Sequence, residues 1–364
     1  MKQIILIVCV VMVSVLISTT STNADITGYT VTDIGAMATT ADESSAFGIN
    51  NSGQVVGYAK IGGLNHPVLW TNGTILDLPR LSDNHSITFS INDSGQAVGS
   101  SYTPSESGHP VLWDNGSITD LGHLGSGGYG GQGGAHDINN DGAVVGYSWL
   151  NTSENHAFLW SNGDMVDLGS TVVGQNSSAY AINDSGQVVG VSAVNNADHA
   201  CLWSQGTATL LDDPDTYLSF ASDINDSGQV VGWSSKGGVQ QAFIWEGGVR
   251  QDLGTFGQRY SRALAINNSG QILGMVYDDD VGIDHFLWSS GEIIYVNDLL
   301  PDWSVRSLND INDAGEIVGQ ARYLHDGLGR RAVLLTPIPE PATLTLLAMG
   351  GLALVRRRKR GMCK

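Results

Sequence analysis

A seven-fold internal repeat constrains this chain more than any other feature. The pair Ile-Asn recurs at intervals of 42 to 47 residues, and a glycine stands eight positions after each of these isoleucines. The pairs are Ile49-Asn50, Ile91-Asn92, Ile138-Asn139, Ile182-Asn183, Ile224-Asn225, Ile266-Asn267 and Ile311-Asn312; the glycines are Gly57, Gly99, Gly146, Gly190, Gly232, Gly274 and Gly319. Such a period predicts one supersecondary unit per copy, stacked on its neighbours to bury a shared core.

Two further markers run in phase with the first. A tryptophan ends a short apolar run in six copies, and Leu335 takes its place in the seventh; the tryptophans are Trp70, Trp113, Trp160, Trp203, Trp245 and Trp288. An acidic-apolar pair follows in most copies, as in Asp77-Leu78 and Asp167-Leu168. Because the tryptophans keep a strict period within apolar runs, we expect them to pack between units rather than to stack on a sugar.

Each copy is predicted to form four strands. The residues around Asn183 to Gly190 read as a hairpin whose Asn-Asp-Ser-Gly turn ends on a glycine that can take a positive φ. A second hairpin turns on Asn162-Gly163, a strong hairpin signal. The flanking residues are β-branched and alternate, and no copy shows the apolar spacing of a helix.

Four strands per copy and seven copies predict an all-β, seven-bladed β-propeller over residues 25–336. The segment Tyr29–Gly35 resembles the last strand of a unit but precedes the first full copy, whereas the seventh copy lacks that strand. We therefore expect the N-terminal strand to complete the last blade, which removes an open sheet edge. An open β-solenoid is the alternative.

The repeats resemble the bacterial extracellular HAF repeat, named for the stretch that appears here as His156-Ala157-Phe158. The resemblance covers about residues 29 to 336. Several copies depart from it, for example at His66-Pro67-Val68 and Gln241-Ala242-Phe243. It supports the fold and implies no enzymatic activity.

The N-terminal residues 1–24 are typical of a secretory signal peptide. Lys2 precedes an apolar run from Ile4 to Ile17, and Ala24 stands before a cleavage position ahead of Asp25. An uncleaved membrane anchor is the alternative, although the run is short for a bilayer. We expect a short apolar helix at this terminus, and a second one at the other.

The C-terminal residues 337–364 contain a motif, an apolar run and a basic cluster in that order. Pro339-Glu340-Pro341 is followed by the apolar residues 342–355, which are expected to form a transmembrane helix, and then by a basic tail that begins with Arg356, Arg357 and Arg358. This arrangement is similar to the PEP-CTERM sorting signal of Gram-negative bacteria. The resemblance implies export, retention in the inner membrane and processing by an exosortase-type peptidase, often in species that make extracellular polysaccharide.

The charge balance argues against nucleic acid as a partner. The chain has 17 Lys and Arg against 36 Asp and Glu, and the two ends hold seven of those bases but only one of the acids. The body between them is therefore strongly acidic and repels phosphate backbones. Its one cysteine, Cys201, has no partner there for a disulfide.

Candidate metal sites are weak in this sequence. The histidines that precede the repeat tryptophans are expected to make a repeated structural hydrogen bond, and the Asn-Asp-Ser-Gly turns are explained by turn chemistry. Asp278, Asp279 and Asp280 form an irregular acidic insertion and are the better candidates for Ca²⁺. A solvated acidic loop is the alternative, and no other cofactor is expected.

No catalytic constellation is visible, so the chain is not expected to be an enzyme. The glycine-rich residues 125–134 follow a strand but open no helix, and this argues against a dinucleotide site. Seven aromatic residues lie off the repeat period and are therefore of more interest for binding: Tyr129, Trp149, Tyr217, Tyr260, Tyr277, Trp303 and Tyr323. Trp149 and Trp303 belong to variable stretches between strands, where binding surfaces are common, and Tyr129 lies in the glycine-rich stretch. Tyr129, Trp149 and Trp303 are the candidate ligand contacts.

The sequence thus favours an exported binding or scaffold module at the cell surface or in the extracellular matrix. Its expected partners are a processing peptidase, the membrane through the C-terminal tail, and either extracellular polysaccharide or surface proteins. A polysaccharide hydrolase or lyase on the same fold is the first alternative. A protein-binding adhesin is the second.

Overall fold

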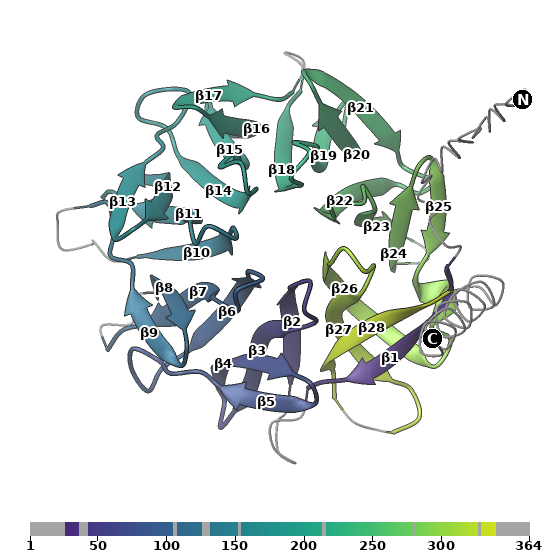
Figure 1. Cartoon of the computed structure of the whole chain (residues 1–364). Coiled ribbons are helices and arrows are strands. Elements are labelled where there is room, and N and C mark those ends of the chain that lie inside the picture. The colour runs from purple at the N-terminus through teal and green to yellow at the C-terminus, as the bar shows by residue number, and fades with distance from the viewer. Residues whose placement is uncertain are drawn as a thin grey trace, which may run out of the picture. The chain divides into compact units, whose positions relative to one another are not determined.

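The fold is a ring of seven four-stranded antiparallel sheets around a common centre (Figure 1). This computed structural model describes residues 26–35, 43–104, 108–125, 132–151, 154–212, 216–279, 282–326 and 329–339. Residues Gly28–Ile338 form one compact unit, with the two ends of the chain outside it. The predicted seven-bladed all-β propeller is confirmed.

Blades 1 to 7 follow the chain, and each is a simple meander from the centre outwards. The innermost strands are β2 (Ser44–Ile49), β6 (Ser86–Ile91), β10 (Gly133–Ile138), β14 (Ser177–Ile182), β18 (Leu218–Ile224), β22 (Tyr260–Ile266) and β26 (Trp303–Ile311). The second strands are β3 (Val55–Ile61), β7 (Ala97–Tyr102), β11 (Val144–Trp149), β15 (Val188–Val194), β19 (Val230–Lys236), β23 (Ile272–Asp278) and β27 (Ile317–Tyr323).

The two outer positions complete each blade. The third strands are β4 (Leu64–Thr71), β8 (Gly108–Asp114), β12 (Asn155–Ser161), β16 (Ala197–Ser204), β20 (Val239–Glu246), β24 (Gly282–Ser289) and β28 (Arg331–Pro339). The outermost strands are β5 (Thr74–Asp77), β9 (Ser117–Asp120), β13 (Asp164–Asp167), β17 (Thr207–Leu210), β21 (Val249–Gly254), β25 (Glu292–Tyr295) and, in blade 7, β1 (Ile26–Asp33).

The ring is closed by strand exchange, as expected. In blade 7, β1 lies beside β28, so the first and last strands of the described chain share one sheet (Figure 1). The N–H of Ile34 donates to the carbonyl of Ala332 at 3.0 Å, which repeats the bond from Leu168 to Ala157 in blade 3. The closing strand therefore has the register of an ordinary outer strand.

The turn between the first and second strands of each blade has the predicted geometry. Its last residue is a glycine with φ between 73° and 80°, for example Gly186 at 75°. The N–H of that glycine donates to the carbonyl of the repeat asparagine, as Gly186 does to Asn183 at 3.0 Å. A side chain other than glycine would strain this backbone. We call the face of the ring that carries these turns the lower face, and the face where the innermost strands begin the upper face.

The repeat glycine on the second strand lies opposite a β-bulge on the first strand. The pairing of β14 with β15 shifts register between Ala179 and Ala181, which leaves Tyr180 as the extra residue. Opposite it, a Cβ added to Gly190 would collide with the carbonyl oxygen of Ser178. The other six repeat glycines meet the same kind of collision. Glycine is needed there because the bulge brings the two backbones too close for a side chain.

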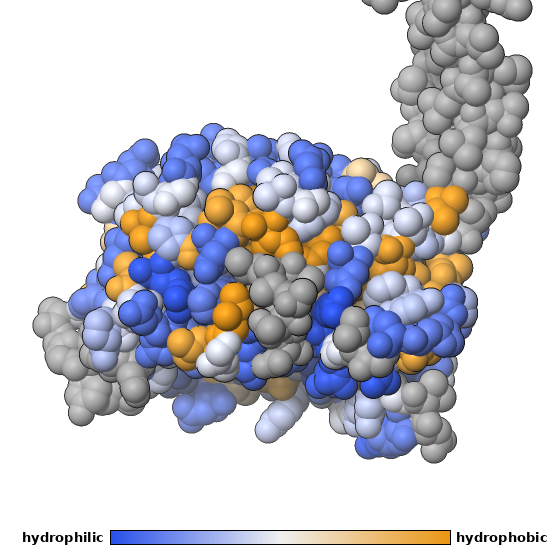
Figure 2. All heavy atoms as spheres, turned by 90° about the horizontal axis from the view of Figure 1, so that it is seen from below, coloured by the Kyte–Doolittle hydropathy of each residue, from blue (hydrophilic) through white to orange (hydrophobic). Residues whose placement is uncertain are grey.

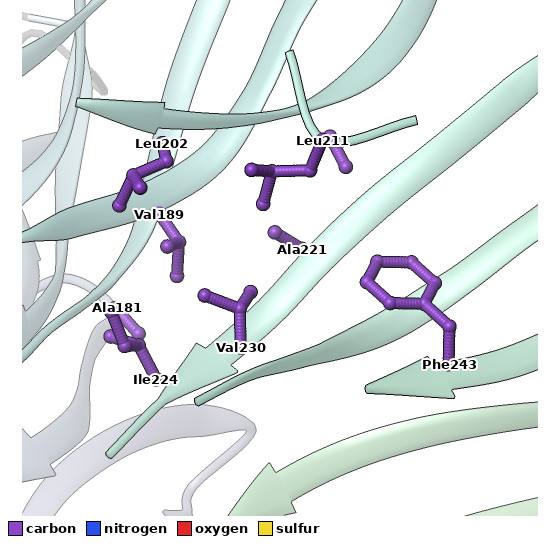
Figure 3. Packing of buried hydrophobic residues seen from close by; sticks show 9 residues of the cluster. Ala181, Val189, Leu202, Leu211, Ala221, Ile224, Val230 and Phe243 are labelled. Atoms are coloured by element: carbon purple, nitrogen blue, oxygen red, sulfur yellow. The ribbon is translucent and has the colours of Figure 1, made fainter. Parts of the chain in front are cut away.

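The hydrophobic core is divided into clusters that join neighbouring blades. One cluster combines Leu202 and Leu211 of blade 4 with Val230 and Phe243 of blade 5 (Figure 3). Each repeat tryptophan belongs to a cluster of this kind, and Leu335 is fully buried in the seventh copy. The prediction that the tryptophans pack between units is confirmed. Neighbouring blades therefore depend on one another for burial.

The rim of the propeller is mostly hydrophilic, with apolar residues showing in an interrupted band (Figure 2). Exposed apolar residues on the outermost strands include Leu76, Val166, Leu210 and Val249. Apolar residues scattered in this way are normal on a soluble surface.

Helix is almost absent from the described part of the chain, where the assigned helix is one short 3₁₀ turn, η1 (Asn297–Leu299). No helix within the described ranges is long and apolar enough to cross a membrane. The apolar helices expected at the two termini, including residues 342–355, are not supported by this structure and lie outside the described residues.

Removal of residues 26–35 tests the closure. The truncated chain loses the strand that covers β28, together with the buried side chains of Tyr29 and Ile34, which are 7% and 6% exposed. We expect a loss of several kcal/mol of stability and self-association through the open edge. Thermal unfolding and size-exclusion chromatography measure both effects, and a peptide with the sequence of residues 26–35 should restore the monomer. A truncated chain that stays monomeric with an unchanged melting temperature would refute the closure.

Candidate functional site

The lower face is held by a closed ring of seven asparagines. The side-chain Nδ2 of each repeat asparagine donates to the backbone carbonyl of the equivalent asparagine in the next blade, at 3.0 to 3.2 Å. Asn312 of blade 7 donates to Asn50 of blade 1, which completes the circle. The seven side chains are 3 to 5% exposed. Each Oδ1 accepts one or more N–H groups of its own turn, as Asn183 does from Gln187.

A second ring surrounds the first. The backbone N–H of the residue after each repeat asparagine donates to the side chain of the equivalent residue in the next blade, at 2.8 to 3.0 Å. These residues are Asn51, Asp93, Asn140, Asp184, Asp226, Asn268 and Asp313. The turn residues thus join the blades.

The axial pocket on this face is small and acidic. Its volume is about 170 Å³, and its lining combines both rings with three deeper aspartates, Asp137, Asp223 and Asp310. These aspartates belong to blades 3, 5 and 7, and each accepts the N–H of the repeat isoleucine in the next blade at 2.7 to 2.9 Å. Blade 1, which follows blade 7 in the closed ring, has Gly48 at the equivalent position. No two neighbouring blades therefore both carry a carboxylate there.

Burial raises the pKa of all three axial carboxyls. It raises the pKa of Asp310 to about 6, with a further contribution from the charge of Asp137. It raises the pKa of Asp223 well above its usual value, although hydrogen bonds from Ile266 and Ile224 oppose this shift. The pKa of Asp137 is also raised, against hydrogen bonds that include one from Ser90. The three groups therefore repel one another across the axis.

The repeat histidines make the structural hydrogen bond that was predicted. In blades 1 to 4 their Nδ1 lies 2.5 to 3.0 Å from an aspartate on or just after the outermost strand, and His156 pairs with Asp167 in this way. Blade 7 uses Arg331 and Asp33, 2.7 Å apart, so the closing strand carries the same cross-strand contact. His285 of blade 6 is buried instead, and this lowers its pKa to about 4.

Three grooves open between blades on the upper face. The groove between blades 2 and 3 has a volume of about 230 Å³ and is lined by Ser100, Tyr102, Gly108, Gln132, Gly133, Tyr147 and Trp149. The groove between blades 3 and 4 has about 440 Å³ and is lined by His136, Tyr147, Asn155, Asn176, Ser177, Ser178, Tyr180, Val191 and Asp198. The groove between blades 5 and 6 has about 330 Å³ and is lined by Gln240, Tyr260, Ser261, Arg262, Met275 and Tyr277. We name them the 2/3, 3/4 and 5/6 grooves.

A row of stacked rings runs from the 3/4 groove to the 5/6 groove. His136 stacks on Tyr180 with ring centres 5.3 Å apart, and Tyr180 stacks on Phe220 at 6.2 Å. Phe220 then stacks on Trp233 at 4.7 Å, and the guanidinium of Arg262 lies 4.2 Å above the Trp233 ring. We call these four rings the aromatic row. It is continuous across blades 3, 4 and 5.

His136 takes part in this row as a neutral ring. Its Nδ1 lies 2.8 Å from the carbonyl of Ala179, which can only accept, so Nδ1 carries the proton. Burial lowers the pKa of His136. An uncharged imidazole flanked by Tyr147 and Tyr180 presents an aromatic surface rather than a positive charge.

The site residues that the sequence predicts are not gathered at one place in the described structure. Trp149 lines the 2/3 groove, and Trp303 packs on Tyr323 with ring centres 5.1 Å apart. Asp279 pairs with Arg259. Tyr129, Asp280, Glu340, Pro341, Arg356, Arg357 and Arg358 lie outside the described residues, and Pro339 ends β28. Binding through Trp149 and Trp303 stays a prediction. Within the described ranges, no group of three or more His, Cys, Asp or Glu is placed to hold a metal ion.

The sequence analysis missed the aromatic row. For two of its four rings, His136 and Tyr180, the signal is the position two residues before the repeat isoleucine, which is aromatic in four consecutive copies: Phe47, Phe89, His136 and Tyr180. These are the bulge residues, and their rings lie close together: Phe47 is 5.6 Å from Phe89, and Phe89 is 6.1 Å from His136. Phe220 and Trp233 stand at other positions.

Residues 337–360 match the PEP-CTERM protein-sorting motif. This motif is a sorting signal recognised by exosortase, and it implies export and processing at the membrane. No curated protein matches the chain. The resemblance of the repeats to HAF units stays a prediction.

Several solved structures have a similar fold. TolB from Acinetobacter baumannii is 12% identical, with a TM-score of 0.44 over 78% of this chain and 80% of that one. A puromycin-hydrolysing peptidase of Mycobacterium tuberculosis is 9% identical, with a TM-score of 0.55 over 82% of this chain and 53% of that one. Aleuria aurantia lectin in complex with α-methyl-L-fucoside is 13% identical, with a TM-score of 0.35 over 75% and 97%. At such identities the likeness concerns the fold alone.

The axial carboxyls predict a pH dependence of stability. Because the folded state holds Asp310 at a pKa of about 6, above the unfolded value of about 4, it binds the proton more tightly than the unfolded state does. The contribution of Asp310 to the free energy of unfolding is therefore greatest below pH ~4, falls as the pH rises to ~6, and is constant above that.

The measurement is urea unfolding of the wild type and Asp310→Asn across this range. The stability of the wild type relative to the variant should fall by roughly 1–3 kcal/mol between pH ~4 and pH ~6. A difference between the two proteins that does not change with pH would contradict the assignment.

Proposed function

We propose that this chain is an exported, non-enzymatic saccharide-binding propeller that acts at the cell surface or in the extracellular matrix. The PEP-CTERM motif supports export and retention until an exosortase-type peptidase acts near Pro339-Glu340-Pro341. A signal peptide at residues 1–24 belongs to the same proposal, and the sorted protein is released from its membrane intermediate to bind polysaccharide.

The observation that carries the binding role is the composition of the 3/4 groove. Three aromatic rings, those of His136, Tyr147 and Tyr180, share it with the amides of Asn155 and Asn176. The hydroxyl of Ser178 and the carboxylate of Asp198 complete a polar side, whereas the hydroxyl of Ser177 is buried and bonded to the backbone of Ala157 and Gly169. A sugar ring has an apolar face that stacks on aromatic rings and a hydroxyl edge that needs donors and acceptors, so this combination suits it.

The repetition of such grooves supports a binding module. The 2/3 and 3/4 grooves share Tyr147, and both lie at the start of the following blade's innermost strand. A polymer with repeating units can occupy several grooves at once, and this raises the apparent affinity without any new contact. A surface protein offers no such regular spacing.

The acids of the axial pocket are poorly placed for a hydrolase. Both oxygens of Asp223 accept backbone N–H groups, from Ile266 and Ile224, and Asp310 is held in the same way. Carboxyls that are committed to the backbone are not free to protonate a leaving group or attack a sugar. We therefore favour binding over turnover.

Replacement of Tyr180 tests the proposal. Tyr180→Ala removes a stacking ring from the 3/4 groove and should weaken binding of the cognate polysaccharide roughly tenfold, whereas Tyr180→Phe keeps the ring and should change it little. Tyr217→Ala is the matched control, because Tyr217 is 76% exposed and lines none of the three grooves.

Isothermal titration against polysaccharides and oligosaccharides from the extracellular matrix, with circular dichroism to check folding, gives the readout. Loss of affinity in a folded Tyr180→Ala but not in Tyr217→Ala supports the proposal. No binding to any glycan, or steady release of reducing ends by the wild type, refutes a non-enzymatic saccharide binder.

A further inference from the structure

The 5/6 groove contains an arginine, Arg262, whose positive charge has no carboxylate counterion among the described residues. Three other arginines of the body pair with aspartates: Arg250 with Asp252, Arg259 with Asp279 and Arg331 with Asp33. Arg262 is half-buried, and the described ranges place no carboxylate in ion-pair distance of it. Arg80, Arg306, Arg322 and Arg330 show no ion pair among the described residues either, so what distinguishes Arg262 is that it lines a groove and is half-buried there.

The guanidinium is held in one orientation from two sides. Its plane covers the Trp233 ring at the end of the aromatic row, with Cζ 4.2 Å from the ring centre. Its Nε and Nη2 both donate to Oε1 of Gln240, at 3.0 and 2.7 Å. Gln240 is neutral, so it orients the guanidinium without neutralising it. A fixed guanidinium fork suits two-point recognition of a carboxylate.

Burial lowers the pKa of Arg262, which shows that its charge is partly removed from water. Stacking on Trp233 offsets part of the free-energy cost of removing the charge of Arg262 from water. An anion bound in the groove would offset the rest, and its attraction to Arg262 is strengthened by the same removal of water.

The walls of the groove favour a sugar as the carrier of that anion. Tyr260 and Tyr277 stack on each other with ring centres 6.2 Å apart and an angle of 13°, and both line the groove beside Arg262. Met275 adds an adaptable apolar contact. The groove thus offers aromatic and apolar surface next to one fixed positive charge. The 3/4 groove differs in charge, because it contains Asp198 and no lysine or arginine among its described lining residues.

We propose that the 5/6 groove binds a carboxylate-bearing sugar unit, with Arg262 contacting the carboxylate and Gln240 positioning Arg262. This rests on the saccharide-binding function proposed above and gives it a substrate class, an acidic polysaccharide of the uronate type. The 3/4 groove then takes an uncharged part of the same polymer.

The test compares charged and neutral forms of one sugar on the full chain. Trisaccharides of galacturonate, glucuronate and mannuronate are titrated together with their methyl esters, which keep the sugar and remove the charge. We expect the wild type to bind at least one free acid at least tenfold more tightly than its ester. Triglutamate, which carries the same charges on a peptide, should bind no better than the esters.

Three variants assign the effect to the site. Arg262→Met keeps a side chain over Trp233 and should remove the tenfold preference for the free acid. Arg262→Lys keeps the charge but loses the fork and should retain part of it. Gln240→Glu places a carboxylate within bonding distance of Arg262, so it should remove the preference while leaving the melting temperature equal or higher.

Each negative result rules out a different part of the proposal. Equal affinity for acid and ester, or an unchanged preference in folded Arg262→Met and Gln240→Glu, overturns the acidic subsite while the saccharide-binding function stands. Tight binding of triglutamate points to an acidic protein partner and overturns the sugar class. No binding of any acid or ester overturns the acidic subsite. If native matrix polysaccharide is not bound either, the saccharide-binding function fails as well.

Discussion

The closed ring of asparagine hydrogen bonds is the interaction on which the rest of the propeller depends. Each of the seven side chains joins its own turn to the next blade, and Asn312 joins the last blade to Asn50 of the first. The groups are buried, so a missing bond would leave a polar atom without water. The ring sets the spacing of the innermost strands, and the hydrophobic clusters between blades form at that spacing.

The two faces of the ring have different roles. The lower face uses its polar groups to join blades, and each of its three axial aspartates accepts a backbone N–H of the next blade. The upper face leaves aromatic and polar side chains in grooves, and the β-bulges supply two of those rings, His136 and Tyr180. The β-bulge in the innermost strand therefore has two effects. It leaves room only for glycine at the repeat position of the second strand, and it contributes rings to a groove.

The fold was predictable because its constraints are local and repeated. Turn residues, strand alternation and the orphan segment Tyr29–Gly35 together predicted blade number and closure. The grooves were not predictable in the same way, since each combines residues from two copies, and the 3/4 groove also depends on β-bulges that alternation does not reveal. Trp149 was found because it breaks the period, whereas the bulge residue Tyr180 and the strand residue Arg262 show their role only through their neighbours in adjacent blades.

Unfolding of Asn225→Asp by urea, beside Asn225→Ala, tests the central claim most directly. The aspartate keeps an oxygen for the N–H of Gln229 but loses the donor to the carbonyl of Asn267 in the next blade. We predict that both variants lose about 2 kcal/mol or more, whereas Asn72→Asp in an exposed turn changes stability by less than about 0.5 kcal/mol. Wild-type stability in Asn225→Asp would show that the bond between blades does not hold the ring together.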